Sequence, residues 1–225
     1  MLGDSMKKRF RLLFAFTLLA LTSLACNISQ VSKIFGEYPP NSGDLLFQDG
    51  FSDPSSGWDQ VRTQEGFTDY ENDRYRILVN STNADYWSNP GLYFMNVRIE
   101  VDAGKNTGPD DNDYGVLCRY QNTENFYFLI ISSDGYYGIG IVEGGEQKLL
   151  HPPQMYQSDF IHTGLSANHI QVICDGPRLA LIVNGEFIAE AYDSTFIDGD
   201  IGLIVGSFDI PGVDLWFDNL MVTNP

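Results

Sequence analysis

Most of the chain alternates between apolar and polar positions with the two-residue period of a β-strand. Residues Met95–Asp102 keep this alternation without a break, which predicts a strand with one buried and one solvated face. Similar patterns predict eight more strands, at 74–80, 114–121, 126–133, 136–143, 170–175, 178–184, 201–208 and 213–222. Glycine-containing turns separate the segments, for example at Asp134-Gly135, Gly144-Gly145 and Asn184-Gly185. No stretch after residue 26 keeps a helical period over three turns, so the pattern predicts an all-β, two-sheet antiparallel β-sandwich.

The first 25 residues have the pattern of an export signal instead. A basic segment precedes the apolar run Leu12–Leu24, whose thirteen residues match the helical core of a signal peptide and are too few to span a bilayer. Small residues at 23 and 25 predict cleavage before Cys26, whether translation starts at Met1 or Met6. Residues 26–43 are polar, contain Pro-Pro-Asn-Ser and are predicted to form a flexible tether. The sandwich domain is then expected at 44–225.

Charge is distributed unevenly between these two parts. Four of the 13 basic residues (Lys7, Lys8, Arg9 and Arg11) and one of the 30 acidic residues (Asp4) lie before Cys26. The mature chain therefore has 9 basic and 29 acidic residues, a net charge of −20. A surface this negative repels nucleic-acid phosphates and anionic lipid headgroups. We expect no nucleic-acid partner and no direct electrostatic docking on a membrane.

Turn geometry predicts which side chains face the core. A two-residue turn at Asp134-Gly135 pairs Leu129 with Gly140. On this register the core face of the hairpin carries four apolar side chains, Phe128, Ile130, Ile139 and Ile141. A three-residue loop at 122–124 then turns Cys118 into the core, and a turn at 176–177 places Cys174 beside Leu179, also facing inward. In an oxidising compartment Cys118 and Cys174 are expected to form a disulfide; the alternative is two buried thiols.

The opposite face of the same hairpins is the predicted ligand-binding site. It carries, above Gly138 and Gly140, the side chains of Arg119, Gln121, Tyr127, Ser133 and Tyr136. Tyrosine rings can stack on the C–H face of a sugar, while arginine and glutamine bind its hydroxyl groups. The alternative is structural: the arginine pairs with a carboxylate and the tyrosines seal the sheet.

Several motifs resemble the concanavalin A-like lectin/glucanase superfamily. They are LFQDGFSDPSSGW from Leu46, DYGVLCRYQ from Asp113, NFYF from Asn125, RLALIVNG from Arg178, GDIGL from Gly199 and FDNL from Phe217. Within that superfamily they look like sandwich domains of bacterial envelope lipoproteins related to laminin-G-like and 3-keto-disaccharide hydrolase domains. The resemblance implies a jelly roll of two curved sheets with the ligand on the concave face. The Glu-x-Asp-x-Glu motif of the superfamily's glucanases is absent, which argues against hydrolysis by that route.

Two acidic groups could hold a structural calcium ion. Relatives of this kind can hold an ion between their terminal strands, where Asp49 and Asp218 lie in this chain. The run Asp110-Asp-Asn-Asp113 also gathers oxygen ligands, although its spacing is not that of an EF-hand and a solvated loop is the alternative.

These observations favour a binding protein over an enzyme. Residues 6–26 resemble a lipoprotein signal, which implies lipid attachment at Cys26 and a place at the outer face of a membrane in the cell envelope, with simple secretion as the alternative. We expect a module that binds glycans or another extracellular polymer and contacts the membrane only through the lipid. The alternatives are a hydrolase of the 3-keto-disaccharide type and a structural interaction domain of the envelope.

Overall fold

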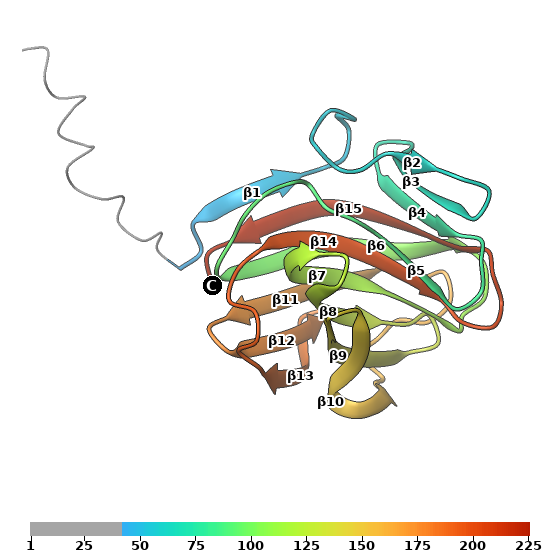
Figure 1. Cartoon of the computed structure of the whole chain (residues 1–225). Coiled ribbons are helices and arrows are strands. Elements are labelled where there is room, and N and C mark those ends of the chain that lie inside the picture. The colour runs from blue at the N-terminus through green and yellow to red at the C-terminus, as the bar shows by residue number, and fades with distance from the viewer. Residues whose placement is uncertain (1–41) are drawn as a thin grey trace, which may run out of the picture. The chain divides into compact units, whose positions relative to one another are not determined.

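The computed structural model describes residues 42–225, which form one compact unit (Figure 1). The predicted signal peptide, the lipidation site Cys26 and nearly all of the tether lie outside these residues. Within 42–225 every regular element is a strand, and no helix there is long and apolar enough to cross a membrane. The prediction of an all-β sandwich is confirmed.

The strands form two antiparallel sheets, which lie as two layers in Figure 1. The nine-stranded sheet runs, from edge to edge, β13 (Glu186–Tyr192), β12 (Arg178–Val183), β11 (Asn168–Asp175), β6 (Val97–Thr107), β15 (Val213–Thr223), β4 (Tyr75–Val79), β3 (Gly66–Tyr70) and β2 (Val61–Arg62), with β1 (Leu45–Asp49) also pairing with β15. The six-stranded sheet runs β10 (Glu146–Gln157), β9 (Tyr136–Glu143), β8 (Asn125–Ile131), β7 (Asn112–Asn122), β14 (Asp200–Ser207) and β5 (Ala84–Ser88). Each of the nine predicted strands corresponds to one of these.

The main core lies between the two sheets. It contains large side chains from both layers, among them Tyr75, Ile99, Phe217, Tyr114 and Leu129, all at most 1% exposed. The alternation seen in the sequence turns one side of each strand toward this core. Burial of this apolar surface is the main source of stability for such a domain.

A disulfide joins the two sheets through this core. Cys118 on β7 bonds to Cys174 on β11, and their Cα atoms are 6.8 Å apart. Both cysteines are completely buried, and Cys174 pairs with Leu179 as the turn geometry predicted. Of the two alternatives from the sequence, the structure therefore has the disulfide.

The predicted register of the β8–β9 hairpin is wrong by one residue. The structure pairs Phe128 with Gly140 and Ile131 with Tyr137, where the sequence analysis paired Leu129 with Gly140. The connection is longer than a two-residue turn, because the amide of Ser132 donates to the carbonyl of Tyr136. A slip of one residue exchanges the two faces of a strand. Phe128 therefore leaves the main core, and the neighbouring Tyr127 enters it.

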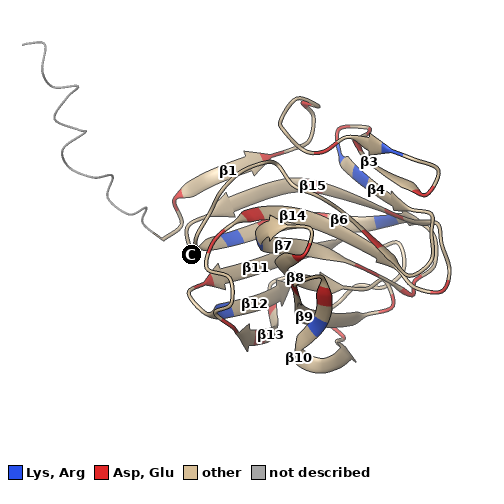
Figure 2. Cartoon of the chain, viewed as in Figure 1, with Lys and Arg blue, Asp and Glu red and all other residues tan. Residues whose placement is uncertain are grey.

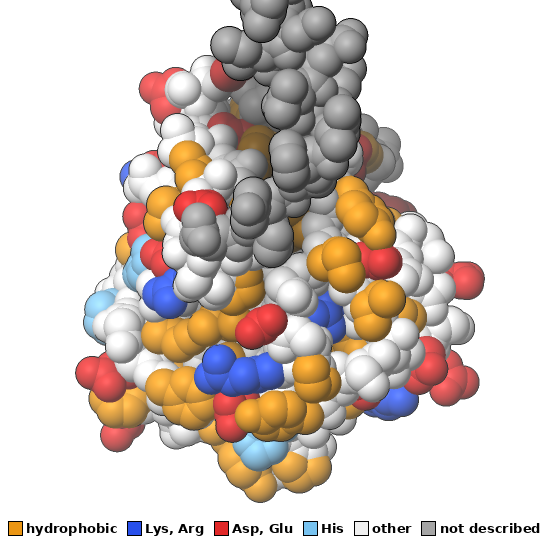
Figure 3. All heavy atoms as spheres, turned by 90° about the vertical axis from the view of Figure 1, so that its left-hand side faces the viewer, with side chains coloured by type: hydrophobic (Ala, Val, Ile, Leu, Met, Phe, Trp, Pro, Cys, Tyr) orange, Lys and Arg blue, Asp and Glu red, His pale blue; other side chains and the backbone are white. Residues whose placement is uncertain are grey.

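Charged groups are mostly acidic across the described domain. Figure 2 shows acidic positions in strands and loops on many sides of the sandwich, with fewer basic positions among them. On the side turned to the viewer in Figure 3, hydrophobic side chains form several groups separated by charged and polar atoms. Exposed hydrophobic residues dispersed in this way are ordinary on a soluble domain.

Candidate functional site

Tyr127 belongs to the core and not to a ligand surface. Its ring is completely buried, and its hydroxyl donates to Asp193 Oδ1 at 2.5 Å while accepting from the amide of Phe196 at 3.0 Å. Burial and the neighbouring Asp193 raise the pKa of Tyr127 to about 12, so the hydroxyl stays protonated. The prediction that Tyr127 stacks on a sugar is wrong, because the register slip turns it inward.

Arg119 is also structural. It has a left-handed backbone conformation (φ 52°) at a bulge in β7, and its side chain is only 2% exposed. The guanidinium donates to the carbonyls of Gly176 at 2.6 Å and Phe196 at 2.9 Å. Burial lowers its pKa. Arg119 thus ties together loops beside the disulfide, and the predicted outward orientation is wrong because the sequence pattern did not reveal the bulge.

The other three predicted ligand residues are separated from one another. Ser133 is buried, and its hydroxyl accepts a hydrogen bond from Asn112. Gln121 is exposed beside the turn that connects β7 to β8. Tyr136, at the start of β9, is 38% exposed and lines a pocket. Of the five predicted residues, Tyr136 alone lines that pocket.

Asp49 and Asp218, the predicted calcium ligands, interact with different groups. Asp49 accepts hydrogen bonds from the amide of Phe51, the hydroxyl of Ser56 and the indole of Trp58. Asp218 lies 3.7 Å from the guanidinium of Arg74. Residues 42–225 contain no group of three or more His, Cys, Asp or Glu side chains placed to hold a metal ion. A calcium ion between the terminal strands stays a prediction.

One face of the six-stranded sheet packs on the main core, and its opposite face carries both apolar and polar side chains. We call it the outer face: the face turned away from the main core. One half is a tightly packed apolar cluster of Leu117, Phe126, Phe128, Ile130, Val142 and Ile204, with Trp87, Tyr120, Leu149 and Met155 packed against it. The glycines at 138 and 140 lie on this face too, and a side chain at Gly140 would collide with the ring of Phe128. The predicted groove above these glycines is therefore filled.

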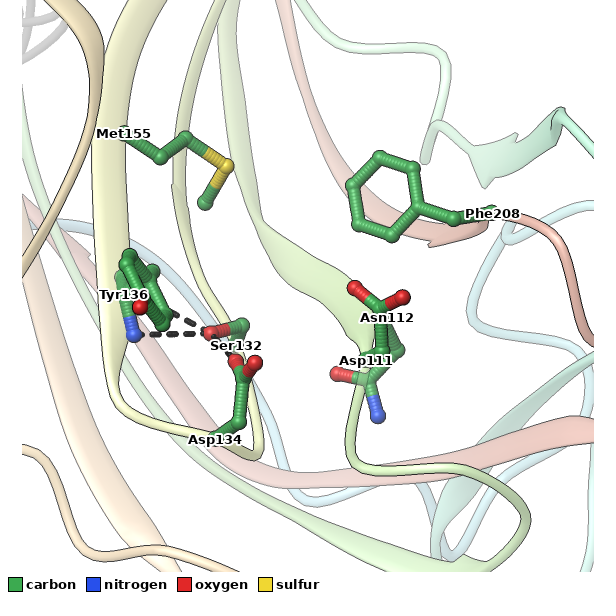
Figure 4. A pocket seen from close by; sticks show the side chains of 7 residues that line it. All are labelled: Asp111, Asn112, Ser132, Asp134, Tyr136, Met155 and Phe208. Carbon is green, nitrogen blue, oxygen red and sulfur yellow. Dashed lines mark hydrogen bonds between the residues drawn. The ribbon is translucent and has the colours of Figure 1, made fainter.

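The other half of the outer face contains a pocket of about 550 Å³ (Figure 4). Its lining residues lie at the start of β7, just after β14, in the connection between β8 and β9, at the start of β9 and on β10: Asp111 and Asn112, Phe208, Ser132 and Asp134, Tyr136, and Met155. In Figure 4, Tyr136 and Phe208 lie on opposite sides of the opening, and the carboxylates of Asp111 and Asp134 lie between them. The lining has two aromatic rings, two hydroxyls (Ser132 and Tyr136), two carboxylates and the amide of Asn112, and it contains no basic side chain.

A pair of carboxylates, one buried and one half-buried, lies on the same face. Asp85 on β5 and Asp113 on β7 are both paired with Gly206 on the strand between them. A side chain at Gly206 would collide with oxygens of both carboxylates, so both extend over this glycine. The pKa of Asp113 is raised to about 8, mainly by burial and secondly by the neighbouring Asp85 carboxylate. Burial also raises the pKa of Asp85.

A second ionic cluster lies on the far side of the nine-stranded sheet. The ring of His169 on β11 lies 2.7 Å from Asp102 and 3.4 Å from Glu100, both on β6. Asn219 donates to the other oxygen of Asp102 from a left-handed position (φ 54°) in a bulge of β15. These contacts link three neighbouring strands, and we assign them to the stability of the sheet.

Comparison with known proteins identifies the fold of the domain through solved structures. No known protein family matches the sequence, and no curated protein matches it. The carbohydrate binding module CBM66 from Bacillus subtilis matches the structure with a TM-score of 0.62 at 17% identity, over 75% of this chain and 96% of that one. The domain has the concanavalin A-like jelly-roll fold. The resemblance stated from the sequence motifs is therefore confirmed at the level of fold.

Two further solved structures have a similar fold, one of a protein of unknown function and one of an enzyme. A Bacillus subtilis protein of unknown function with a galectin-like fold matches with a TM-score of 0.62 at 12% identity, over 82% of this chain and 97% of that one. The catalytic domain of a laminarinase, an endo-1,3-beta-glucanase from Thermotoga petrophila, matches with a TM-score of 0.56 at 10% identity, over 80% and 97%. At such identities the likeness is one of fold, which does not assign a function.

Proposed function

We propose that this protein binds glycans through the pocket on the outer face of its six-stranded sheet. The observation that carries the proposal is the pairing of two aromatic side chains, Tyr136 and Phe208, across an opening whose rim carries oxygen acceptors (Figure 4). Sugar rings present C–H groups that pack on aromatic rings, and hydroxyl groups that donate to carboxylates. The volume of about 550 Å³ is within the usual range of small-ligand pockets, roughly 300–1,000 Å³.

The charge of the pocket favours neutral or cationic sugars over acidic ones. Asp111 and Asp134 line it, and no lysine, arginine or histidine does. A carboxylate or sulfate on a glycan would meet like charge in a partly desolvated site, which costs free energy. We therefore exclude uronic acids and sulfated sugars from the expected ligands.

Export and anchoring complete the proposal. A basic segment followed by thirteen apolar residues and small residues before Cys26 favours a lipoprotein signal. The mature domain would then be held at the outer face of a membrane by a lipid on Cys26. With a net charge of −20 it gains nothing from anionic headgroups, so the lipid is the proposed membrane contact.

Hydrolysis is a second candidate function, and the carboxylate pair favours it. The nearest carboxylate oxygens of Asp85 and Asp113 are no more than roughly 5 Å apart across Gly206. Retaining glycosidases hold their two carboxyl groups about 5–5.5 Å apart. Asp113 is, however, only 6% exposed and does not line the pocket. Binding is therefore the function that the geometry supports better.

A glycan-array screen of the soluble mature chain (residues 27–225), with and without calcium, tests the proposal. We expect neutral or amino-bearing glycans to bind and acidic ones not to. Each glycan that binds is then incubated with the protein and analysed by mass spectrometry. Cleavage that is lost in Asp113→Asn would establish the hydrolase, and the absence of any glycan ligand would favour a structural role in the envelope.

A further inference from the structure

The space above Gly206 is bounded by carboxylates from both neighbouring strands. A methyl group on Gly206 would lie 2.6 Å from each oxygen of Asp113, and it would also collide with Oδ1 of Asp85. Glycine is thus the residue that leaves this space open. Because the pairing of β5, β14 and β7 sets all three residues in one row, the convergence is a property of the sheet and not of a flexible loop.

Asp113 differs from every other buried charged residue in the described domain. Lys105, Arg119, Asp200 and Asp214 each have an opposite charge or hydrogen-bond partners, such as Arg76 for Asp214 and the amide of Gly91 for Asp200. Within residues 42–225 neither Asp113 nor Asp85 receives a hydrogen bond or an ion pair through its carboxylate. A buried carboxylate without a partner is costly, and a second carboxylate beside it increases the cost.

Small solutes can still reach this pair. Asp113 is 6% exposed and Asp85 is half-buried. No side-chain nitrogen or oxygen in the described part of the chain is both fully enclosed and without a partner, so the oxygens of Asp113 keep some contact with solvent. The space also adjoins the pocket, because Asp111 and Phe208 lie two residues along the chain from Asp113 and Gly206, just beyond the ends of β7 and β14.

We propose that the space above Gly206 is a cation site, in which Asp85 and Asp113 bind one positive charge between them. Two sources can supply that charge. A divalent metal ion suits oxygen ligands, and water would complete its shell because two carboxylates are fewer than a full coordination sphere. The ammonium group of an amino sugar suits the pair equally, since it offers three donors to acceptors only.

The test measures thermal unfolding and calorimetric binding of the soluble mature chain, with one probe or one control added at a time. CaCl₂, MgCl₂ and glucosamine hydrochloride are the probes, and N-acetylglucosamine and NaCl at matched ionic strength are the controls. Calcium sites of extracellular modules have dissociation constants of about 10⁻⁴–10⁻³ M. At 10 mM, a site of about 1 mM would raise the folding equilibrium constant on the order of tenfold. Stabilisation by CaCl₂ or MgCl₂ would identify a metal ion as the bound cation, and stabilisation by glucosamine would identify an ammonium group.

Three variants and one control variant decide whether the pair is responsible. Asp85→Asn and Asp113→Asn should each abolish the stabilisation, and both should fold because they remove like-charge repulsion. Asp159→Asn, at an exposed position in the turn that follows β10, is the matched control and should bind as wild type does. Gly206→Ala should block the space while keeping both carboxylates.

The proposal is overturned if no cation binds more strongly than matched NaCl, which would mean that the pair holds only a proton. It is equally overturned if Asp113→Asn binds the cation as wild type does. Neither result bears on the proposed glycan pocket, because neutral glycans are measured separately. A pocket that binds no glycan would likewise leave the cation site standing.

Discussion

The effect of removing the disulfide on the free energy of unfolding can be calculated from the structure. Cys118 and Cys174 are 56 residues apart in sequence and link β7 to β11 across the core. The soluble mature chain (residues 27–225) has no other cysteine, since Cys26 is the third of three. The double variant Cys118→Ala/Cys174→Ala therefore removes the bridge without creating a free thiol.

The expected loss follows from the length of the closed loop. A crosslink lowers the chain entropy of the unfolded state, and for a loop of this length the effect is about 4 kcal/mol at 25 °C. Domains of this kind are usually stable by about 5–15 kcal/mol, so the variant should fold with a much reduced margin. The two sheets stay packed by their apolar core, and the pocket is formed by other residues.

Urea unfolding followed by tryptophan fluorescence measures this loss. We expect the free energy of unfolding to fall by about 4 kcal/mol and the wild type in reducing agent to approach the variant. Neutral glycan binding should be unchanged at temperatures where the variant is folded. A loss below about 1 kcal/mol would refute the reasoning, because the unfolded chain would then gain little freedom from breaking the bridge.

Three further predictions concern residues whose roles differ between sequence and structure. Tyr127→Phe should lower the free energy of unfolding by about 1–3 kcal/mol, since Asp193 loses one of its donors and the buried amide of Phe196 loses its acceptor; unchanged stability with lost glycan binding would show that Tyr127 is a ligand residue. Arg119→Met should destabilise by a similar amount in urea unfolding, because the carbonyls of Gly176 and Phe196 lose their donor; a variant as stable as wild type would contradict this. Cys26→Ala should move the protein from the membrane to the soluble fraction on cell fractionation, and continued membrane association would refute lipid anchoring.

The sequence predicted the fold because the apolar–polar alternation is a local signal. The alternation runs over the eight residues Met95–Asp102, six of which lie in strand β6, and glycine-containing turns mark other strands. Strands β1, β2, β3, β5, β10 and β13 were not assigned from the pattern. In β10 the reason is visible, since Pro152 and Pro153 and two shifts of register interrupt the alternation.

The predicted ligand-binding face is wrong because the face on which a side chain lies depends on the register of strand pairing. A bulge with a left-handed Arg119 and a longer connection after Ser132 each shift the pairing, and neither has a strong local signature. The inward orientation of Cys118 survived, since it lies on the regular part of β7 before the bulge.

The pocket and the carboxylate pair required the three-dimensional structure. Asp85 and Asp113 are 28 positions apart in the sequence, and β14, which brings them together, is formed by residues about 90 positions later. Phe208 likewise meets Tyr136 only through the order of strands in the sheet. The one local signal is the acidic run at 110–113, whose pattern predicts either a calcium-binding or a solvated loop.

The central claim is that the pocket between Tyr136 and Phe208 binds glycans. Isothermal titration of the best glycan from the array, with wild type and the double variant Tyr136→Ala/Phe208→Ala, tests it most directly. Tyr192→Ala is the control, because Tyr192 is an exposed tyrosine on the other sheet. We predict that the double variant binds on the order of tenfold more weakly, since two ring contacts are lost, and that the control binds normally. Equal affinity of all three proteins would contradict the account.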